Sequence, residues 1–251
     1  MELLSRDRVM IILDETSSTN SELKQLQKKE KLPEGSIVMA EYQTHGRGQA
    51  GNTWFSDKGC NLLFSFILYP KLIAANKQFI ISRIVSLAIK KVLDKYIDNI
   101  SIKWPNDIYW KDKKIAGMLI ENSLMGQNIN SSIIGIGLNV NQDGFPKDLP
   151  NPVSMKMITR NEYSRDELLS FFLSEFNFLY QSLQNGGDEK VIESDYMRNL
   201  YRRDDNHWFE DSKERYKGRI IDVLPSGHLV IETLNNKEER IYAFKEVSFV
   251  L

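Results

Sequence analysis

A glycine-rich segment is the first part of the sequence that could do chemistry. Gly46, Gly48 and Gly51 are interleaved with Arg47 and followed by Trp54. Glycines let backbone N–H groups approach a ligand closely, arginine supplies a permanent positive charge, and tryptophan supplies a flat face. The segment therefore suits an anion that carries a planar group. A mobile surface turn accounts for the same composition equally well, so both interpretations stay open at this point.

Two common phosphate-binding motifs do not fit this segment. Its glycines satisfy G-x-G-x-x-G, but the dinucleotide fingerprint also needs a helix directly afterwards and an acidic residue about 20 positions later. No Asp or Glu occurs between Asp57 and Asp94, and strand-like residues follow the glycines. The pattern G-x-x-x-x-G-K-[ST] does not occur in the sequence. The sequence therefore argues against a dinucleotide site and against a P-loop.

Metal and thiol chemistry find little support. His45, His207 and His228 lack the spacing of metal ligands, and Cys60 has no evident base. Lys114 beside a turn would by itself be a solvated surface lysine.

Helix and strand signals surround the polar residues. Thr19 and Glu22 match a capping box, which predicts that Thr19 caps a helix running to about residue 30. Strands are expected at 37–41, 61–69 and 132–141, and a hairpin joins strands 108–110 and 114–121 through residues 111–113. Apolar residues at helical spacing predict a helix over 76–97, and a second capping box at Ser164 and Glu167 begins another.

The pattern changes beyond about residue 206. Short apolar runs at 215–223, 228–233, 240–244 and 247–251 alternate with turn residues, which is typical of a small all-β domain. We therefore expect two domains, a large one over 1–205 and a small one over 206–251.

Composition excludes several classes of protein. The chain has 251 residues, of which 41% are hydrophobic and 27% charged, so it can bury one large core and a small second one. A net charge of -1 gives no basic field for nucleic acid, and no apolar run reaches the ~20 residues of a membrane span. The single cysteine fits a reducing compartment. We expect a cytoplasmic protein that binds neither DNA nor a membrane.

Four short segments follow one another along the chain. They are Ser18-Thr19-Asn20; Gln43 with Gly46-Arg47-Gly48-Gln49-Ala50-Gly51-Asn52-Thr53-Trp54; Lys103-Trp104-Pro105-Asn106-Asp107 with Lys114-Ile115-Ala116-Gly117; and Gly135-Ile136-Gly137-Leu138-Asn139-Val140. Together they resemble the catalytic domain of biotin protein ligases, and the β-rich tail resembles the family's small C-terminal barrel. The resemblance implies an α+β fold similar to class II aminoacyl-tRNA synthetases, with a mixed β-sheet, flanking helices and a small C-terminal β-barrel domain.

The resemblance assigns one end of the site to biotin. Ser18, Thr19, Asn20 and Gln43 would surround the biotin rings, whose uncharged ureido group offers donors and an acceptor to short polar side chains. A helix cap is the alternative role of Thr19, and both can hold.

The resemblance assigns the chemistry to three charged residues. Arg47 and Lys114 would hold the biotin carboxylate and the α-phosphate of ATP, two anions that otherwise repel each other. Asp107 and Asn106 would either position Mg²⁺ or receive the proton of the acceptor lysine, and both roles stay open. Trp54 would stack over the adenylate.

The remaining assignments concern close approach to the ligand. Gly46, Gly48 and Gln49 of the loop and Gly117 would contact it, and Asn139 would reach the adenine or phosphate region. For the strand of Asn139 the alternative is a strand thinned by glycine for packing. Trp104 would be a wall of the biotin pocket or plain core.

The implied activity is the ATP-dependent formation of biotinyl-5'-adenylate and transfer of biotin to a lysine of a biotin carboxyl carrier protein, of acetyl-CoA carboxylase or a related carboxylase. Gln49 and Asn52 depart from a common form of the motif, which has further arginines there. Only a short segment precedes Ser18, so no DNA-binding winged helix is expected. Related ligases also self-associate through a sheet edge, which would make a homodimer.

Three rival functions remain. A lipoate ligase shares the fold and the adenylation chemistry, but its arginine- and glycine-rich signature is not found. A non-catalytic scaffold would not need Arg47, Lys114 and Asp107. A nucleic-acid-binding role is disfavoured by the net charge.

Overall fold

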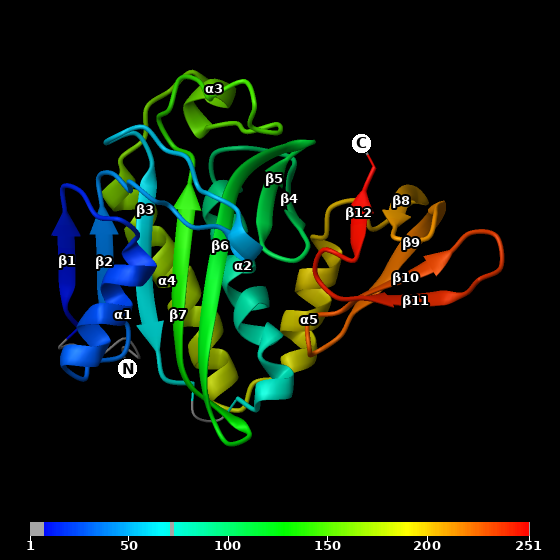
Figure 1. The fold of residues 1–251 in the computed structure, drawn as a ribbon, viewed down its shortest axis with the longest axis horizontal. Helices are drawn as coiled ribbons and strands as arrows, with labels where there is room; N and C mark the ends of the chain where they lie inside the picture. Colours follow the sequence, from blue (N-terminus) through cyan, green and yellow to red (C-terminus); the bar gives the residue numbers. More distant parts are fainter. Residues whose placement is uncertain (1–7, 71–72, 251) are drawn as a thin grey trace.

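The computed structural model describes residues 8–70 and 73–250 and centres on a seven-stranded mixed sheet (Figure 1). Its strand order is β1-β2-β3-β7-β6-β5-β4, in which β1 and β2 are parallel and the other neighbours antiparallel. The strands are β1 (Met10–Leu13), β2 (Ile37–Ala40), β3 (Leu62–Leu68), β4 (Ile100–Lys103), β5 (Asp107–Trp110), β6 (Lys113–Met125) and β7 (Asn128–Leu138).

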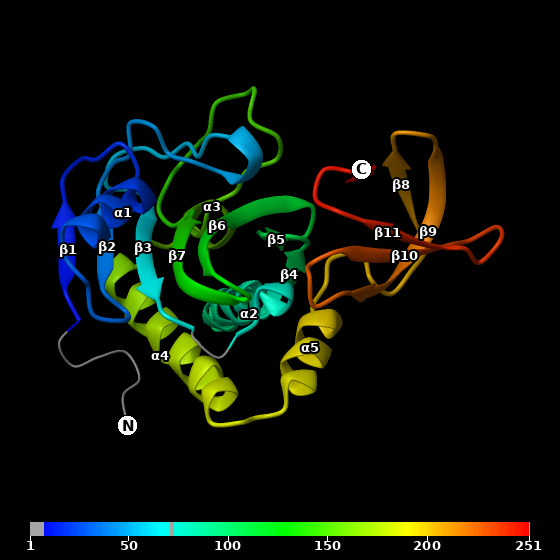
Figure 2. The same ribbon diagram turned by 60° about the horizontal axis from the view of Figure 1, so that its bottom comes forward.

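Long helices cover one face of this sheet. Figure 2 shows α2 (Phe79–Leu93) and α4 (Arg165–Gln184) side by side beneath the curved sheet. Side chains alternate across β3, so Leu62, Phe64, Phe66 and Leu68 point into the core that the helices close. The periodicity that predicts a helix over 76–97 is correct, but the helix is shorter, because residues 75–77 form a 3-10 turn and the chain leaves the helix at Asp94.

A shorter helix covers part of the opposite face. Helix α1 (Thr19–Lys29) lies over β2, β3 and β7, where Leu23 packs with Val38, Ile67 and Ile133 in a second, small apolar cluster. Apart from the short 3-10 helix of residues 49–51, loops cross the rest of this face in Figure 2. The α1 face of the sheet is therefore the face that is open to a ligand.

The first predicted capping box is wrong. The N-cap of α1 is Ser18, which makes no side-chain capping bond, and Thr19 is the first helical residue. The Thr19 hydroxyl donates to Gln43 instead, so a tertiary contact replaces the local cap. The second cap is confirmed, because Ser164 Oγ accepts the backbone N–H of Glu167.

Several short elements were not predicted. They are β1, β4, α3 (Met155–Thr159), α5 (Glu189–Arg198) and β8 (His207–Asp211). Each has ten residues or fewer, so its pattern spans too few positions to show a period. The predicted hairpin is confirmed with a shorter turn, since Trp110 pairs with Lys113.

The C-terminal residues form a second sheet, antiparallel and five-stranded, in the order β11-β10-β9-β8-β12 (Figure 1). Its further strands are β9 (Arg215–Val223), β10 (Leu229–Thr233), β11 (Glu239–Tyr242) and β12 (Val247–Phe249). The expected small C-terminal β unit is therefore present, with one strand, β8, more than predicted. Within the described residues we find no helix whose length and hydropathy would let it cross a membrane.

A buried arginine joins the two sheets. Arg83 of α2 is 2% exposed, and its guanidinium donates to Glu193 of α5 at 2.5 Å and to the backbone carbonyl of Val223 in β9. The rings of Phe79 and Tyr196 flank it at 5.7 and 5.9 Å. One side chain thus ties α2, α5 and the C-terminal sheet together.

Arg83→Ala is expected to lower the free energy of unfolding by about 3 kcal/mol, because it removes the buried partner of a half-buried ion pair, leaves the Val223 carbonyl without its donor and opens a cavity. Urea denaturation measures the change. The matched control is Arg198→Ala, which removes an exposed ion pair with Asp195 and is expected to cost less than about 0.5 kcal/mol. Equal losses in the two variants would contradict this role of Arg83.

Candidate active site

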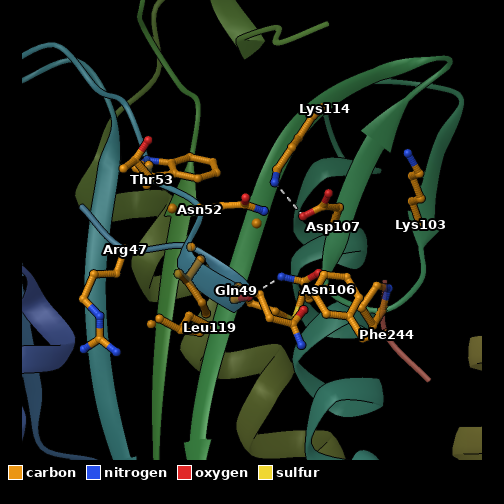
Figure 3. A pocket seen from close by; sticks show the side chains of 18 of the residues that line it. Arg47, Gln49, Asn52, Thr53, Lys103, Asn106, Asp107, Lys114, Leu119 and Phe244 are labelled. Atoms are coloured by element: carbon orange, nitrogen blue, oxygen red, sulfur yellow. Dashed lines mark hydrogen bonds and ion pairs between the residues drawn. The ribbon is translucent and has the colours of Figure 1, made fainter. Parts of the chain in front are cut away.

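A groove of about 410 Å³ crosses the α1 face of β7 and β6. The start of α1 lines one end, β5 and the beginning of β6 line the other, the loop 47–54 crosses between them, and residues 244–249 of the C-terminal region add a further wall. Segments far apart in the sequence therefore meet at one cavity (Figure 3).

Buried polar groups form the end of the groove near α1. A parallel bridge between Thr16 and Gln43 places Gln43 beside the helix start. Gln43 Oε1 then accepts the backbone N–H of Thr19 at 2.8 Å and its hydroxyl at 3.1 Å. Ser18, Thr19 and Asn20 are each 3% exposed. The helix start therefore presents fixed polar groups to the groove and uses few of them for capping.

A buried serine supports this end from within the sheet. Ser65 of β3 is 0% exposed, and its hydroxyl lies 2.6 Å from Asn20 Oδ1 and 2.7 Å from Thr19 Oγ1. Alternation along β3 turns Ser65 toward α1, away from the core that Phe64 and Phe66 enter. The sequence held a signal for Ser65, because it is the only polar residue in an otherwise apolar strand.

Glycines make the floor of the groove thin. A Cβ at Gly135 would collide with Asn20 Oδ1, and one at Gly137 would lie 2.6 Å from Trp54 Cζ2. A Cβ at Gly117 would lie 3.0 Å from the same indole. The Trp54 ring therefore rests directly on the backbone of β6 and β7, and the glycines serve this close approach.

The loop that carries Trp54 is folded as a small hairpin. Arg47 and Thr53 form an antiparallel bridge, and the backbone N–H of Trp54 donates to the carbonyl of Gly46 at 2.8 Å. The loop is therefore a hydrogen-bonded hairpin, and its contact with a ligand stays a prediction. Gly48 and Gln49 line the groove, whereas Gly46 does not.

A lysine and a carboxylate form the other end. Lys114 Nζ lies 2.7 Å from Asp107 Oδ1, and both side chains are partly exposed, at 32% and 20% (Figure 3). The register of β5 and β6 shifts between Ile108 and Tyr109, which is a β-bulge. Lys114 and Gly117 are three residues apart and would face opposite sides of a regular strand, so the bulge turns Lys114 into the groove.

Neighbouring residues complete this end. Asn106 donates to the carbonyl of Met118 at 2.8 Å, which fixes its amide. Trp104 is buried, lines the groove and donates to the carbonyl of Gly227 at 2.8 Å, so it is both wall and core. Burial lowers the pKa of the Lys103 ammonium, and the nearby Asp107 carboxylate opposes that shift.

Besides Gly46, two predicted site residues lie elsewhere than expected. The Arg47 guanidinium does not lie with Lys114, because it pairs with Glu121 at 2.8 Å and points away from the lysine (Figure 3). Asn139 is buried beyond the groove lining, where its amide donates to the carbonyl of Val153 at 3.1 Å. Their contacts with ligands stay predictions.

Glu121 was not singled out in the sequence. Alternation along β6 places it on the same face as Gly117 and Leu119, and this spacing was the available signal. Among the described residues no group of three or more His, Cys, Asp or Glu side chains could hold a metal ion.

Comparison with known proteins decides the family. Residues 12–139 match the model of the biotin/lipoate A/B protein ligase family. The chain belongs to this family. In a search of curated proteins it is 34% identical over 190 residues to biotin–protein ligase 1, chloroplastic, of Arabidopsis thaliana, which covers 73% of this chain and 50% of that protein. It is 28% identical over 238 residues to the bifunctional ligase/repressor BirA of Bacillus subtilis, covering 92% and 70%.

The fold of the chain is that of biotin protein ligases, which is related to class II aminoacyl-tRNA synthetases. The biotin protein ligase of Aquifex aeolicus, solved with biotin and ATP, superposes with a TM-score of 0.78 at 25% identity and covers 96% of this chain and 97% of that one. The Leishmania major ligase superposes with a TM-score of 0.63 at 19% identity, which supports the fold alone. The chain spans about half the length of the first curated relatives that it matches, at 50%, 53% and 55%.

In this member of the biotin/lipoate ligase family, Gly137→Ala is expected to lift Trp54 from the sheet and loosen the loop. Tryptic cleavage after Arg47 in the native protein should then be several-fold faster, as measured by mass spectrometry. Gly144→Ala is the control, because a Cβ there meets nothing within 4 Å. If both variants are cleaved at the wild-type rate, Gly137 is not needed for the seating of Trp54.

Proposed function

We propose that this protein is a biotin protein ligase, which forms biotinyl-5'-adenylate from biotin and ATP and transfers biotin to a lysine of a biotin carboxyl carrier protein. The observation that carries the proposal is a single groove with a buried, uncharged polar end and a lysine–carboxylate pair at its other end. The family membership and the fold of the ligases support it.

The polar end favours biotin over lipoate. The ureido group of biotin has two N–H donors and a carbonyl acceptor, which Thr19, Asn20 and Gln43 can satisfy without any charge. The dithiolane ring of lipoate has no such groups, so the hydrogen-bonding capacity that these side chains keep beyond their contacts with one another would stay unused. A site built to hydrogen-bond a ligand rejects an analogue that lacks the matching groups.

The charged end suits the first step. The carboxylate of biotin attacks the α-phosphorus of ATP, a P–O bond forms to the carboxylate oxygen, and pyrophosphate leaves with the electrons of the broken bond. Lys114 places a positive charge where both anions meet, and the ring of Trp54, 5.5 Å from its Nζ, screens the site from water. The loop residues Gln49 and Asn52 are neutral, and Arg47 is paired with Glu121, so we assign this role to Lys114; Lys103 and Lys245 also line the groove.

The donors at this end fit Mg²⁺ carried by ATP. Magnesium is commonly held by one or two protein oxygens together with phosphates and water, and Asp107 and Asn106 offer a carboxylate and an amide oxygen side by side. When bound, the ion would neutralise charge on the phosphates. Asp107 itself keeps Lys114 oriented through their ion pair.

The second step requires an uncharged acceptor amine. The lysine nitrogen of the carrier attacks the acyl carbonyl, a C–N bond forms, and AMP leaves with the electrons of the C–O bond. Asp107 is the carboxylate among the lining residues and can accept the proton that the amine loses. Phe244, Val247 and Phe249 put the C-terminal sheet at the groove, where the carrier would approach. We propose that residues 206–251 form a small domain that helps to receive the carrier protein. We also propose that the reaction takes place in the cytoplasm.

The test is pyrophosphate exchange into ATP by the purified protein with Mg²⁺ and biotin, lipoate or no acid. Biotin-dependent exchange is expected. Lys114→Ala should lower its rate about 10²–10³-fold, since one preorganised donor contributes that much to such reactions. The adjacent exposed Lys113→Ala should keep the wild-type rate. Exchange with lipoate alone would assign the sister activity, and exchange with neither acid would overturn adenylation altogether.

A further inference from the structure

Glu121 contacts two side chains that line the groove, one at the start of α1 and one in the loop. Its Oε2 accepts the side-chain N–H of Asn20 at 2.9 Å, and its Oε1 accepts the Arg47 guanidinium at 2.8 Å. Arg47 also lies 3.3 Å from the hydroxyl of Ser21. One carboxylate therefore contacts both the helix start at the polar end and the loop that carries Trp54.

The contact with Asn20 sets which way its amide faces. Asn20 Oδ1 lies 2.6 Å from Ser65 Oγ, and Asn20 Nδ2 donates to Glu121 and, at 3.3 Å, to the carbonyl of Leu119. Flipping the amide would turn its NH₂ group onto the serine and its oxygen onto a carboxylate and a carbonyl, two acceptors. The negative charge of Glu121 therefore opposes the flip.

The contact with Arg47 fixes the position of the loop's one charged side chain. Arg47 is the only charged side chain between Gly46 and Trp54, and it faces Glu121 and not Lys114. Burial alone would raise the pKa of the Glu121 carboxyl, but its hydrogen bonds with Asn20 and Arg47 lower it, so the carboxylate is charged at neutral pH. Glu121 thus gives Arg47 a defined position while Trp54 covers the groove.

Resting on the proposed ligase function, we propose that Glu121 is a positioning residue for adenylation, which holds Asn20 for the head of biotin and fixes Arg47, and with it the loop that carries Trp54, beside the start of α1. Glu121 itself does not line the main groove but lines a neighbouring hollow together with Leu119 and residues of the loop. It acts through the two side chains that it contacts.

Two substitutions separate these contacts. Glu121→Gln keeps an oxygen for Asn20 but removes the charge that holds Arg47. Biotin should therefore bind within about threefold of wild type by calorimetry, while the rate constant of adenylate formation falls about tenfold, because loss of orientation slows the chemical step. Glu121→Ala removes both contacts, and biotin affinity should fall about tenfold or more, as expected when a hydrogen bond to a charged group is lost.

A double-mutant cycle tests whether Glu121 acts through Arg47. In the Arg47→Ala background, Glu121→Gln should change the adenylation rate by less than about twofold, because the partner is already gone. Glu30→Gln, an exposed glutamate at the end of α1, is the control and should behave as wild type in both assays. Thermal unfolding of each variant shows whether it is folded.

The outcomes are distinct. If the rate losses of Arg47→Ala and Glu121→Gln multiply in the double variant, Glu121 does not act through Arg47. If Glu121→Ala binds biotin with wild-type affinity, Glu121 does not position Asn20. Either result would overturn the positioning role and leave the ligase function intact. A wild-type protein without biotin-dependent exchange would overturn the proposed function and this inference with it. The proposed function and the positioning role are both supported if the rate losses at Arg47 and Glu121 are coupled, and if Glu121→Gln lowers mainly the rate while Glu121→Ala also lowers biotin affinity.

Discussion

Side-chain alternation along β3, β6 and β7 decides both what holds the fold together and where its groove lies. On one face these strands carry large apolar residues, which α2 and α4 cover. On the other face the same strands carry Ser65, Gly117, Gly135 and Gly137, which leave room for Asn20 and Trp54. A slip of one residue in register would exchange the faces, placing a serine and glycines in the core and phenylalanines in the groove.

Because one face of these strands packs in the core while the other forms the floor of the groove, that floor is rigid. Strand β7 lies between β3 and β6 in the sheet, and the buried side chains of its other face hold it against the helices. Backbone that is held on both edges and on one face cannot move to make space, so the space above it must come from missing side chains. None of Gly117, Gly135 and Gly137 has a positive φ, so their backbone conformation does not require glycine. Glycine is needed there because a Cβ would collide with Asn20 or with the ring of Trp54.

The sequence predicted the parts that depend on local pattern. Apolar periodicity located α2, strand and turn patterns located the hairpin of β5 and β6 and most strands of the second sheet, and the four motif segments contained most of the residues that line the groove. Contacts between distant segments were not accessible in this way. Thr19 satisfied a capping pattern, yet Gln43, 24 residues later, took its hydroxyl. The bulge that aims Lys114 is likewise a property of strand pairing, and the partner of Arg47 lies 74 residues away.

Charge placement is the link between the groove and the rest of the molecule. The middle of the groove is neutral, since Gln49 and Asn52 stand in the loop. Two of its cations are paired with carboxylates near the margins, Lys114 with Asp107 and Arg47 with Glu121, which itself lies outside the main groove; Lys103 and Lys245 also line the groove. Lys114 and Arg47 are therefore each held by a carboxylate before a ligand arrives, which keeps them oriented and limits the repulsion between them. An incoming anion must compete with that carboxylate, so the pairs favour ligands that bring two anionic groups at once. The proposed adenylation brings a carboxylate and a phosphate together, and this pair of anions meets the condition better than either anion alone.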